Sequence, residues 1–368
     1  MAEITTAEIR EFLGKRQGMK VTLASIRKEF NILQGTKSFD AVRNIMFQLG
    51  EAKGDGKIVR PLGDGIYKVI EQVVPVSVFG VERERRPIFE LVFPRDFNTM
   101  KEMNFAKDVV IREGDLITLG GVKSKGKTTL CLNICGENID KKPVLMGNEY
   151  TVLITDDENK EKARYEPAPR FLHRLDAMDV NKDGWINWID SNGNDKFILL
   201  PVRDDYAEHI VKNKINIIDW INLDAEKLYG IGKVLENIKA NLGRGIAIIA
   251  LQKSESANNP RGGQFVRDFS DLELLLDGYG SNEDNILLTI KGAKEKHSPI
   301  VGKTYAYSIS GSGTKILNFR EVRKCPSCHG NGYVKGEKCD TCYGNKFIDI
   351  KPSVDNPVEP DEQEELPF

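Results

Sequence analysis

The sequence contains no apolar run of about 18 residues, the length that a membrane-spanning helix needs. Its first residues, MAEITTAEIR, do not have the pattern of a signal peptide. Net charge is almost absent, at −2, so a nucleic-acid partner would have to meet local basic patches. The chain has 368 residues, of which 40% are hydrophobic and 29% charged, as in ordinary globular proteins. We therefore expect a cytoplasmic protein of two or three domains.

Cysteine is also scarce, and four of the six cysteines lie close together near the C-terminus. Cys325, Cys328, Cys339 and Cys342 form two C-x₂-C pairs that ten residues separate. Four thiolates at this spacing are typical of a closed, structural Zn²⁺ site. A cytosolic chain of this size has no need of disulfides there. The sequence therefore predicts a zinc module over residues 323–349.

The first cysteine pair belongs to the segment CPSCHGNG, which resembles the C-x-x-C-x-G-x-G knuckle of DnaJ-type zinc domains. The second segment, CDTCYGNK, departs from that pattern at its last glycine. DnaJ-type proteins usually carry two such sites, so a single site indicates a borrowed knuckle rather than a chaperone. Binding of single-stranded nucleic acid and binding of a protein both remain open for this module.

Residues 1–72 form the first predicted domain. The segments TTAEIREFLGKR, TLASIRKEF and SFDAVRNIMFQLGEA have helical spacing, with Thr5 or Thr6 and Thr22 as N-caps. KIVRPL and IYKVI follow as two strands around a GDG turn. This order resembles a winged helix-turn-helix, although a small helical domain that contacts a protein is the alternative. In the DNA-binding interpretation the third helix exposes Lys37, Arg43, Asn44 and Gln48.

Three further segments follow. Residues 73–112 contain Val-Pro and Phe-Pro breaks and the charged run ERERRP, which predict a linker or adaptor. Residues 113–322 alternate apolar strand-like runs with helical patterns, which predicts an α/β domain with a mainly parallel sheet. Residues 350–368 form an acidic, proline-containing tail that we expect to be disordered.

The tail ends in EPDEQEELPF, which resembles the tip of bacterial single-stranded-DNA-binding proteins. Gln363, Leu366 and Phe368 also resemble the Q-x-x-L-x-F peptide that docks on sliding clamps. Both resemblances imply a replication-protein partner, and a terminus that only improves solubility is the alternative.

The segment GVKSKGKT, residues 121–128, has the full P-loop pattern, with a strand-like run before it and a helical pattern after it. Backbone N–H groups of such a loop cradle phosphates at a helix N-terminus. Lys127 would neutralise the β- and γ-phosphates of ATP, and the Thr128 hydroxyl would ligate Mg²⁺. The predicted ATP-binding residues are Gly121, Val122, Lys123, Ser124, Lys125, Gly126, Lys127, Thr128 and Thr129.

Three later strand-like runs end in polar side chains. Glu149 follows VLMGN, Asp219 follows INII, and Gln252 ends GIAIIALQ. Ligands of open α/β sheets bind at the carboxyl ends of the strands, so we expect the three side chains beside the P-loop. A carboxylate such as Glu149 can orient the attacking water. Asp219 would support Mg²⁺ through water, and Gln252 would sense the γ-phosphate.

The order strand, P-loop, Glu149, Asp219, Gln252 resembles the RecA-type ATPases, which include recombinases and DnaB-type hexameric helicases. The resemblance covers about residues 100–320 and implies a RecA-like core and a phage-like or bacterial replication or recombination protein. NNPRGGQFVRDFSDLELLLD resembles the mobile DNA-binding loop of RecA, which implies that Arg261 and Arg267 contact DNA. ILLTIKGAKEKHSP resembles the RecA strand whose lysine pair reaches a neighbouring subunit's ATP site. Here that pair would be Lys294 and Lys296, with a solvated charge run as the alternative.

The segment DVNKDGWINWID matches the start of an EF-hand loop. Asp179, Asn181, Asp183 and Asp190 would hold Ca²⁺. An acidic turn closed by its own side chains is the alternative.

These observations predict an ATPase that uses ATP, Mg²⁺ and Zn²⁺, forms a ring or filament and binds DNA, most simply single-stranded DNA. It would act as a helicase, recombinase or loader. The alternative is a DNA-binding regulator that uses ATP as a conformational switch. A small-molecule kinase is disfavoured because the sequence shows no lid or acceptor motif.

Overall fold

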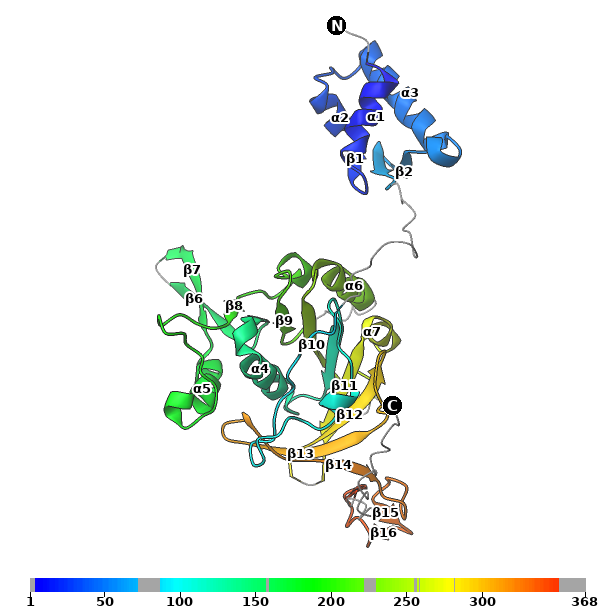
Figure 1. Cartoon of the computed structure of the whole chain (residues 1–368). Coiled ribbons are helices and arrows are strands. Elements are labelled where there is room, and N and C mark those ends of the chain that lie inside the picture. Colours follow the sequence, from blue (N-terminus) through cyan, green and yellow to red (C-terminus); the bar gives the residue numbers. More distant parts are fainter. Residues whose placement is uncertain are drawn as a thin grey trace, which may run out of the picture. The chain divides into compact units, whose positions relative to one another are not determined.

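The computed structural model describes residues 4–71, 87–156, 159–221, 230–254, 257, 259–280 and 282–350. The chain divides into two compact units, Met1–Arg83 and Glu84–Phe368 (Figure 1). Within the described ranges, no helix is long and apolar enough to cross a membrane. The acidic tail from residue 351 onward and residues 73–86 of the expected linker lie outside the described residues.

The first unit contains three helices and a small antiparallel sheet of order β1-β3-β2. Thr5, Thr22 and Thr36 cap the helices with their side chains, because each accepts a backbone N–H that the helix leaves unpaired. The elements are α1 (Thr6–Gly14), β1 (Lys20–Thr22), α2 (Leu23–Glu29), α3 (Lys37–Glu51), β2 (Val59–Gly63) and β3 (Ile66–Val69).

The three helices and the hairpin of this unit lie where the sequence predicts them. The three-residue strand β1 was not predicted, because so short a strand leaves no period to recognise. The four polar residues of α3 that the sequence predicts as exposed are exposed, namely Lys37, Arg43, Asn44 and Gln48. Their contact with DNA remains a prediction.

The second unit is built on a ten-stranded sheet of order β8-β5-β9-β10-β4-β11-β12-β13-β14-β17 (Figure 1). Neighbours from β8 to β11 are parallel, and neighbours from β11 to β17 are antiparallel. The sheet is therefore mixed, and the expectation of a mainly parallel sheet holds for its first half. The reason is that β11 to β14 follow one another through turns, without crossover helices.

The strands of this sheet are short and mostly buried. They are β4 (Leu116–Gly121), β5 (Val144–Met146), β8 (Ile198–Leu200), β9 (Ile215–Ile218), β10 (Ile246–Gln252), β11 (Leu272–Gly278), β12 (Asn285–Ala293), β13 (Thr304–Ser310), β14 (Lys315–Lys324) and β17 (Phe347–Asp349). Two separate hairpins are formed by β6 (Thr151–Asp156) with β7 (Asn159–Pro167), and by β15 (Tyr333–Val334) with β16 (Glu337–Lys338).

Apolar side chains cover both faces of the parallel half. Ile117 and Leu119 of β4 belong to one core with α4 (Lys127–Glu137) and α5 (Pro169–Met178), whereas Leu116 belongs to the other with α6 (Ile231–Asn241) and α7 (Gln264–Phe269). Because both faces are covered, strands such as β9 and β10 read as continuous apolar runs. The ends of the strands are left free to carry polar side chains.

Residues 87–112, part of the segment expected to be a linker or adaptor, pack into the core of the second unit. Phe93, Met103 and Phe105 are at most 2% exposed and pack into the α4 side of the core. The Phe89 N–H also donates to the carbonyl of Ile111, at 2.7 Å. The buried aromatic side chains attach this segment to the α/β domain. Its prolines and charged residues, which suggested a linker, gave no indication of this packing.

Candidate nucleotide site and zinc site

The P-loop leaves β4 at Gly121 and enters α4 at Lys127. Gly126 caps the helix with φ 77°, and a Cβ there would lie 2.6 Å from Cδ1 of Ile309, so the position requires glycine. Lys127 Nζ donates to the carbonyls of Gly121 and Val122, at 2.9 and 2.8 Å. Burial lowers the pKa of Lys127, while the charges of Asp219 and Glu149 oppose that shift. The ammonium group thus lies folded over the loop, within the field of two carboxylates.

A cavity of about 510 Å³ lies against this loop. Its walls include Lys127 and Thr128 of the loop and the three strand-end residues Glu149, Asp219 and Gln252. The structure therefore brings these five predicted residues to one place. Of the other predicted ATP-binding residues, the cavity is also lined by Lys123, Ser124, Lys125, Gly126 and Thr129.

The register of the parallel strands explains why these residues meet. Gly121 at the end of β4 pairs with Gln252 at the end of β10. Met146 of β5 pairs with Ile218 of β9, the residue before Asp219. All four strands run in the same direction, so their carboxyl ends share one edge of the sheet.

Asp219 is the most deeply buried carboxylate of the site. It is 0% exposed, and this burial raises its pKa to about 6, with the charge of Glu149 acting in the same direction. The Thr128 hydroxyl, Lys127 and Tyr150 oppose the shift, and the Tyr150 hydroxyl donates to Asp219 Oδ2 at 3.2 Å. Within the described part of the chain, Oδ1 of Asp219 has no hydrogen-bond partner. A buried, unpaired carboxylate oxygen beside a threonine hydroxyl fits a hydrated Mg²⁺.

Gly147 holds the turns after β5 and β9 against each other. Its φ is 126°, and a Cβ at this position would lie 2.0 Å from the backbone oxygen of Asp219. No other residue fits without displacing backbone. The glycine therefore fixes the spacing between Asp219 and the turn that carries Glu149.

Sequence reasoning missed two arginines of the cavity, Arg170 and Arg174. They lie one turn apart on α5, on the same side of the helix. The β6–β7 hairpin separates them from Glu149 in sequence, yet the Ala168 N–H donates to the Tyr150 carbonyl at 2.8 Å and closes the base of the hairpin. The spacing of the two arginines in PRFLHRLDAM was the available signal. The cavity is completed by Trp220, Glu283, Asp284, Ile286, Ile309 and Gly313.

Lys294 and Lys296 do not line this cavity. Lys294 directly follows Ala293 at the end of β12, and Ala293 pairs with Leu272 at the start of β11. Because β11 runs parallel to β4, the start of β11 lies beside the start of β4. The lysine pair therefore lies at the amino edge of the sheet, opposite the P-loop. Lys294 Nζ is 3.1 Å from Asp271 Oδ1, and both lysines are exposed.

The segment that resembles a DNA-binding loop is described in part, without residues 255, 256 and 258. Arg261 is exposed, and its backbone N–H donates to the carbonyl of Gln252 at 2.9 Å. Arg267 donates to the buried Glu273 at 3.3 Å and to Asn259 at 3.1 Å. Among the described residues the Arg261 side chain has no ion-pair partner, whereas Arg267 is paired with Glu273.

The carboxylates of the calcium-like loop do not converge. The His, Cys, Asp and Glu side chains of the described chain offer ligand atoms for a metal ion. Ligand atoms from three or more of these side chains lie within 4.8 Å of one another in one place only, the cluster of four cysteines. Asp179 instead accepts the N–H of Asn181 at 3.0 Å, and Asp190 accepts those of Asn192 and Asn194 at 2.8 and 2.9 Å. Each aspartate closes its own turn, so the structure favours the acidic-turn interpretation over calcium.

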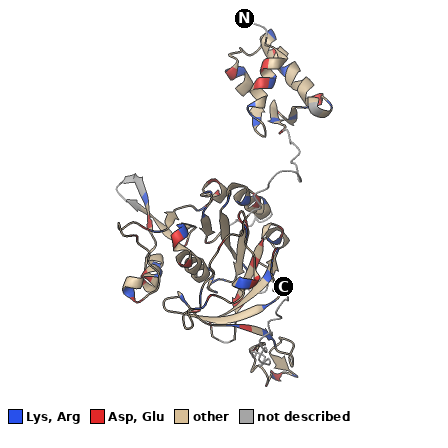
Figure 2. Ribbon diagram, viewed as in Figure 1, with Lys and Arg blue, Asp and Glu red and all other residues tan. Residues whose placement is uncertain are grey.

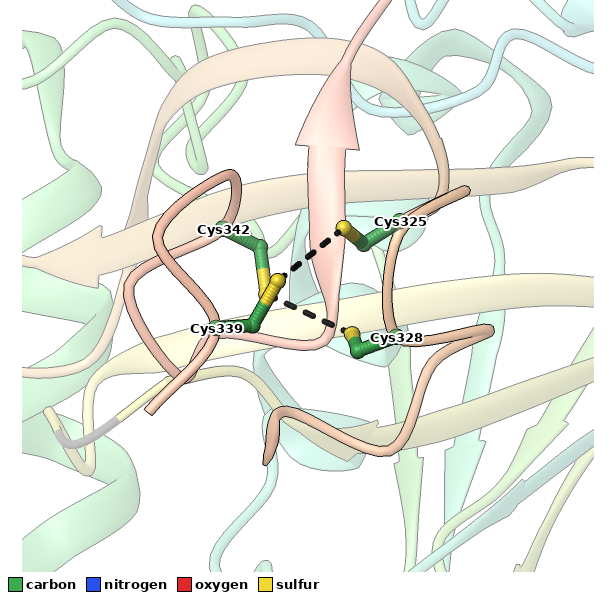
Figure 3. A group of neighbouring side chains, drawn as sticks. All are labelled: Cys325, Cys328, Cys339 and Cys342. Atoms are coloured by element: carbon green, nitrogen blue, oxygen red, sulfur yellow. Dashed lines mark hydrogen bonds between the residues drawn. The ribbon is translucent and has the colours of Figure 1, made fainter. Parts of the chain in front are cut away.

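The four cysteines do converge, and all are buried (Figure 3). The Sγ atoms of Cys325 and Cys339 are 3.7 Å apart, and those of Cys328 and Cys342 are 3.6 Å apart. Zinc–thiolate bonds of about 2.3 Å in a tetrahedron place the sulfurs about 3.8 Å apart. These two separations are those of a tetrahedral Zn²⁺ site, so the cluster fits one Zn²⁺. It is joined to the large sheet through β17, which pairs with β14.

Comparison with known proteins gives distant likenesses. No protein-family model and no curated protein matches the sequence. Among solved structures, the chain is similar to a RadB recombinase, with 14% identity and a TM-score of 0.38 over 56% of this chain and 91% of that one. It is also similar to a DnaB-like replicative helicase, with 11% identity and a TM-score of 0.37 over 56% of this chain and 59% of that one, so it spans less than two thirds of the helicase.

Proposed function

We propose that the protein is a DNA-dependent ATPase of replication or recombination that works as a RecA-type assembly, as a helicase, recombinase or loader. The observation that carries the proposal is the convergence of Lys127, Thr128, Glu149, Asp219 and Gln252 on one cavity beside a P-loop. Phosphoryl transfer needs positioned cations and a positioned water more than covalent chemistry. The cavity offers both kinds of group.

Each residue then has a separate task. The loop N–H groups and Lys127 bind the β- and γ-phosphates. Thr128 and Asp219 hold Mg²⁺, which supplies charge neutralisation on the phosphate oxygens when bound. Glu149 is exposed to the cavity and orients the attacking water. Deep burial keeps Asp219 in place, so its role is to hold rather than to attack.

Gln252 connects the nucleotide site to the candidate DNA-binding loop. Its side chain lines the cavity, and its carbonyl accepts the N–H of Arg261. A shift of Gln252 on loss of the γ-phosphate would therefore move the start of that loop. Arg261 and Arg267 in this loop, and Lys37 and Arg43 on α3, are the proposed DNA contacts.

The lysine pair fits a role in a neighbouring copy. A residue that completes the next subunit's site in a head-to-tail assembly must lie away from its own site. Lys294 and Lys296 lie at the amino edge of the sheet, and the P-loop lies at the carboxyl edge. We therefore assign them to the ATP site of an adjacent subunit, in a ring or a filament.

The test is ATP turnover with and without single-stranded DNA, together with negative-stain images. Lys127→Ala should abolish turnover, and Lys101→Ala, which changes an exposed lysine outside the cavity, should not. Unchanged turnover in Lys127→Ala would refute the ATPase. Rings indicate a helicase and filaments a recombinase. ATP-dependent DNA binding without turnover in the wild type would instead support the DNA-binding regulator.

A further inference from the structure

The zinc module is an internal repeat. Residues 324–332, KCPSCHGNG, and residues 338–346, KCDTCYGNK, share Lys, both Cys, Gly and Asn at matching positions. The contacts repeat as well, because the Cys325 N–H donates to the Lys346 carbonyl and the Cys339 N–H donates to the Gly332 carbonyl, both at 2.9 Å. Lys346 stands in the second half at the position of Gly332 in the first half. Like Gly332 it has a positive φ, of 69°. The two halves therefore face each other with near two-fold symmetry around the four sulfurs.

The exposed surface of this repeat carries two tyrosines. Tyr343 is 79% exposed and Tyr333 is 51% exposed. A tyrosine ring gains free energy when it is buried, so a binding partner that covers these rings would be stabilised by them. Neither ring belongs to a hydrophobic cluster of the described chain.

Two lysines lie close to the chain at both tyrosines. Lys338 pairs with Tyr333 across the β15–β16 hairpin, and cross-strand partners point to the same face. The aliphatic part of Lys338 also lies next to Gly344, the neighbour of Tyr343. Its Cδ is 3.7 Å from the point where a Cβ on Gly344 would lie. Lys346 lies in the same way along Gly332, the neighbour of Tyr333, at 3.3 Å. These contacts bring the chain at Tyr333 and Tyr343 close to the two lysines. All four side chains are exposed, and we call them the Tyr–Lys surface.

The charge of the module is positive and unpaired. Residues 323–349 contain five basic residues against Glu337, Asp340 and Asp349, whereas acidic and basic residues are mixed over the other described parts of the chain (Figure 2). In the described ranges none of these five forms an ion pair. The five are Arg323, Lys324, Lys335, Lys338 and Lys346.

We propose that the Tyr–Lys surface binds single-stranded nucleic acid. Unpaired bases stack on Tyr333 and Tyr343, and Lys338 and Lys346 bind the phosphates between them. A peptide fits less well, because β15 and β16 have two residues each and offer no strand edge of useful length. The proposal gives the DNA-dependent ATPase a further DNA contact, in addition to the loop that carries Arg261 and the helix α3, and it rests on that proposed function.

The test uses the full chain and a labelled oligothymidylate, with binding followed by fluorescence anisotropy at several salt concentrations. Tyr333→Ala and Tyr343→Ala should each weaken binding about tenfold, since one stacked base contributes that much. Lys338→Ala should reduce the slope of log affinity against log salt by about 0.7, the value for one phosphate contact on a single strand. Tyr165→Ala, at an exposed tyrosine of the β6–β7 hairpin, should change neither quantity. Zinc content should equal that of the wild type in every variant.

Crosslinking to a bromodeoxyuridine oligonucleotide locates the contact independently of affinity. We expect crosslinked peptides from residues 323–349. Unchanged affinity in both tyrosine variants, or crosslinks confined to other segments, would overturn the proposal. Tyrosine variants that bind DNA normally but no longer bind a partner protein would assign the surface to a peptide. That result would also overturn the proposal.

Turnover without DNA separates this proposal from the proposed function. The tyrosine variants should keep it, because neither residue lines the nucleotide cavity. A wild type without turnover would refute the ATPase, whereas crosslinks at Tyr343 would still uphold the Tyr–Lys surface.

Discussion

Replacing Asp219 by Asn should stabilise the nucleotide-free protein at neutral pH and at the same time abolish ATP turnover. The carboxylate is fully buried, and Oδ1 has no hydrogen-bond partner in the described chain. Its charge is therefore unfavourable until a cation binds beside it. The asparagine removes the charge and keeps the shape, but it cannot hold Mg²⁺ as an anion can.

The magnitude follows from the pKa. Burial raises the pKa of Asp219 from 3.8 to about 6, a difference of about 2 units, or about 3 kcal/mol. Between these two values the folded state binds more protons than the unfolded state, so stability falls as the pH rises through this window. Above about pH 6 the full cost is present. The asparagine NH₂ needs an acceptor and the attraction to Lys127 is lost, so we expect a net gain of about 1–3 kcal/mol at pH 8.

Urea unfolding followed by tryptophan fluorescence measures this gain. All three tryptophans of the chain, at positions 185, 188 and 220, belong to the second unit, so the signal reports that unit. The measurement is made without Mg²⁺ and nucleotide, at pH 8 and at pH 5. Asp268→Asn, at an exposed aspartate of α7, serves as the control and should change stability by less than about 0.5 kcal/mol.

Two results would refute the reasoning. One is an Asp219→Asn protein that is less stable than the wild type at pH 8. The other is an advantage that is as large at pH 5 as at pH 8, because protonation should already have removed about half of the cost at the lower pH.

Three further predictions concern other parts of the second unit. Gly147→Ala should lower the free energy of unfolding by about 2–5 kcal/mol through strain and overlap with Asp219, measured by the same urea titration; a change below about 1 kcal/mol would contradict the close contact. Lys294→Ala with Lys296→Ala should lower turnover of the assembled protein and spare ATP binding by the monomer; equal loss of both would contradict a role in a neighbouring subunit. Metal analysis should find about one zinc per chain. Chelation of the zinc should unfold the cysteine module, which hydrogen exchange would show as a loss of protection. A module that stays folded without metal would contradict the four-thiolate site.

Most of the nucleotide site was predictable because its residues stand at strand ends. A short apolar run followed by Glu149, Asp219 or Gln252 is visible locally, and parallel strands bring such ends together wherever the fold is α/β. Arg170 and Arg174 could not be found in this way. They belong to a helix that follows an inserted hairpin, so their distance to the P-loop depends on tertiary packing.

Local pattern alone does not decide the role of two other segments. Asp179 and Asp190 match metal-ligand positions in sequence, yet each binds the backbone two residues ahead. Phe93 and Phe105 stand in a segment with the composition of a linker, yet they enter the core. The cysteine cluster was predictable because thiolate spacing alone defines the site.

The placement of the P-loop and the lysine pair at opposite edges of the sheet has a counting consequence. If the lysine pair acts in the neighbouring subunit as proposed, an open row of n copies has one end subunit without a neighbour to supply lysines, so n−1 sites would be complete. Turnover per chain would then rise with the length of the row, and hence with protein concentration, toward a plateau. A closed ring has no such end, and its turnover per chain would be constant once the ring has formed.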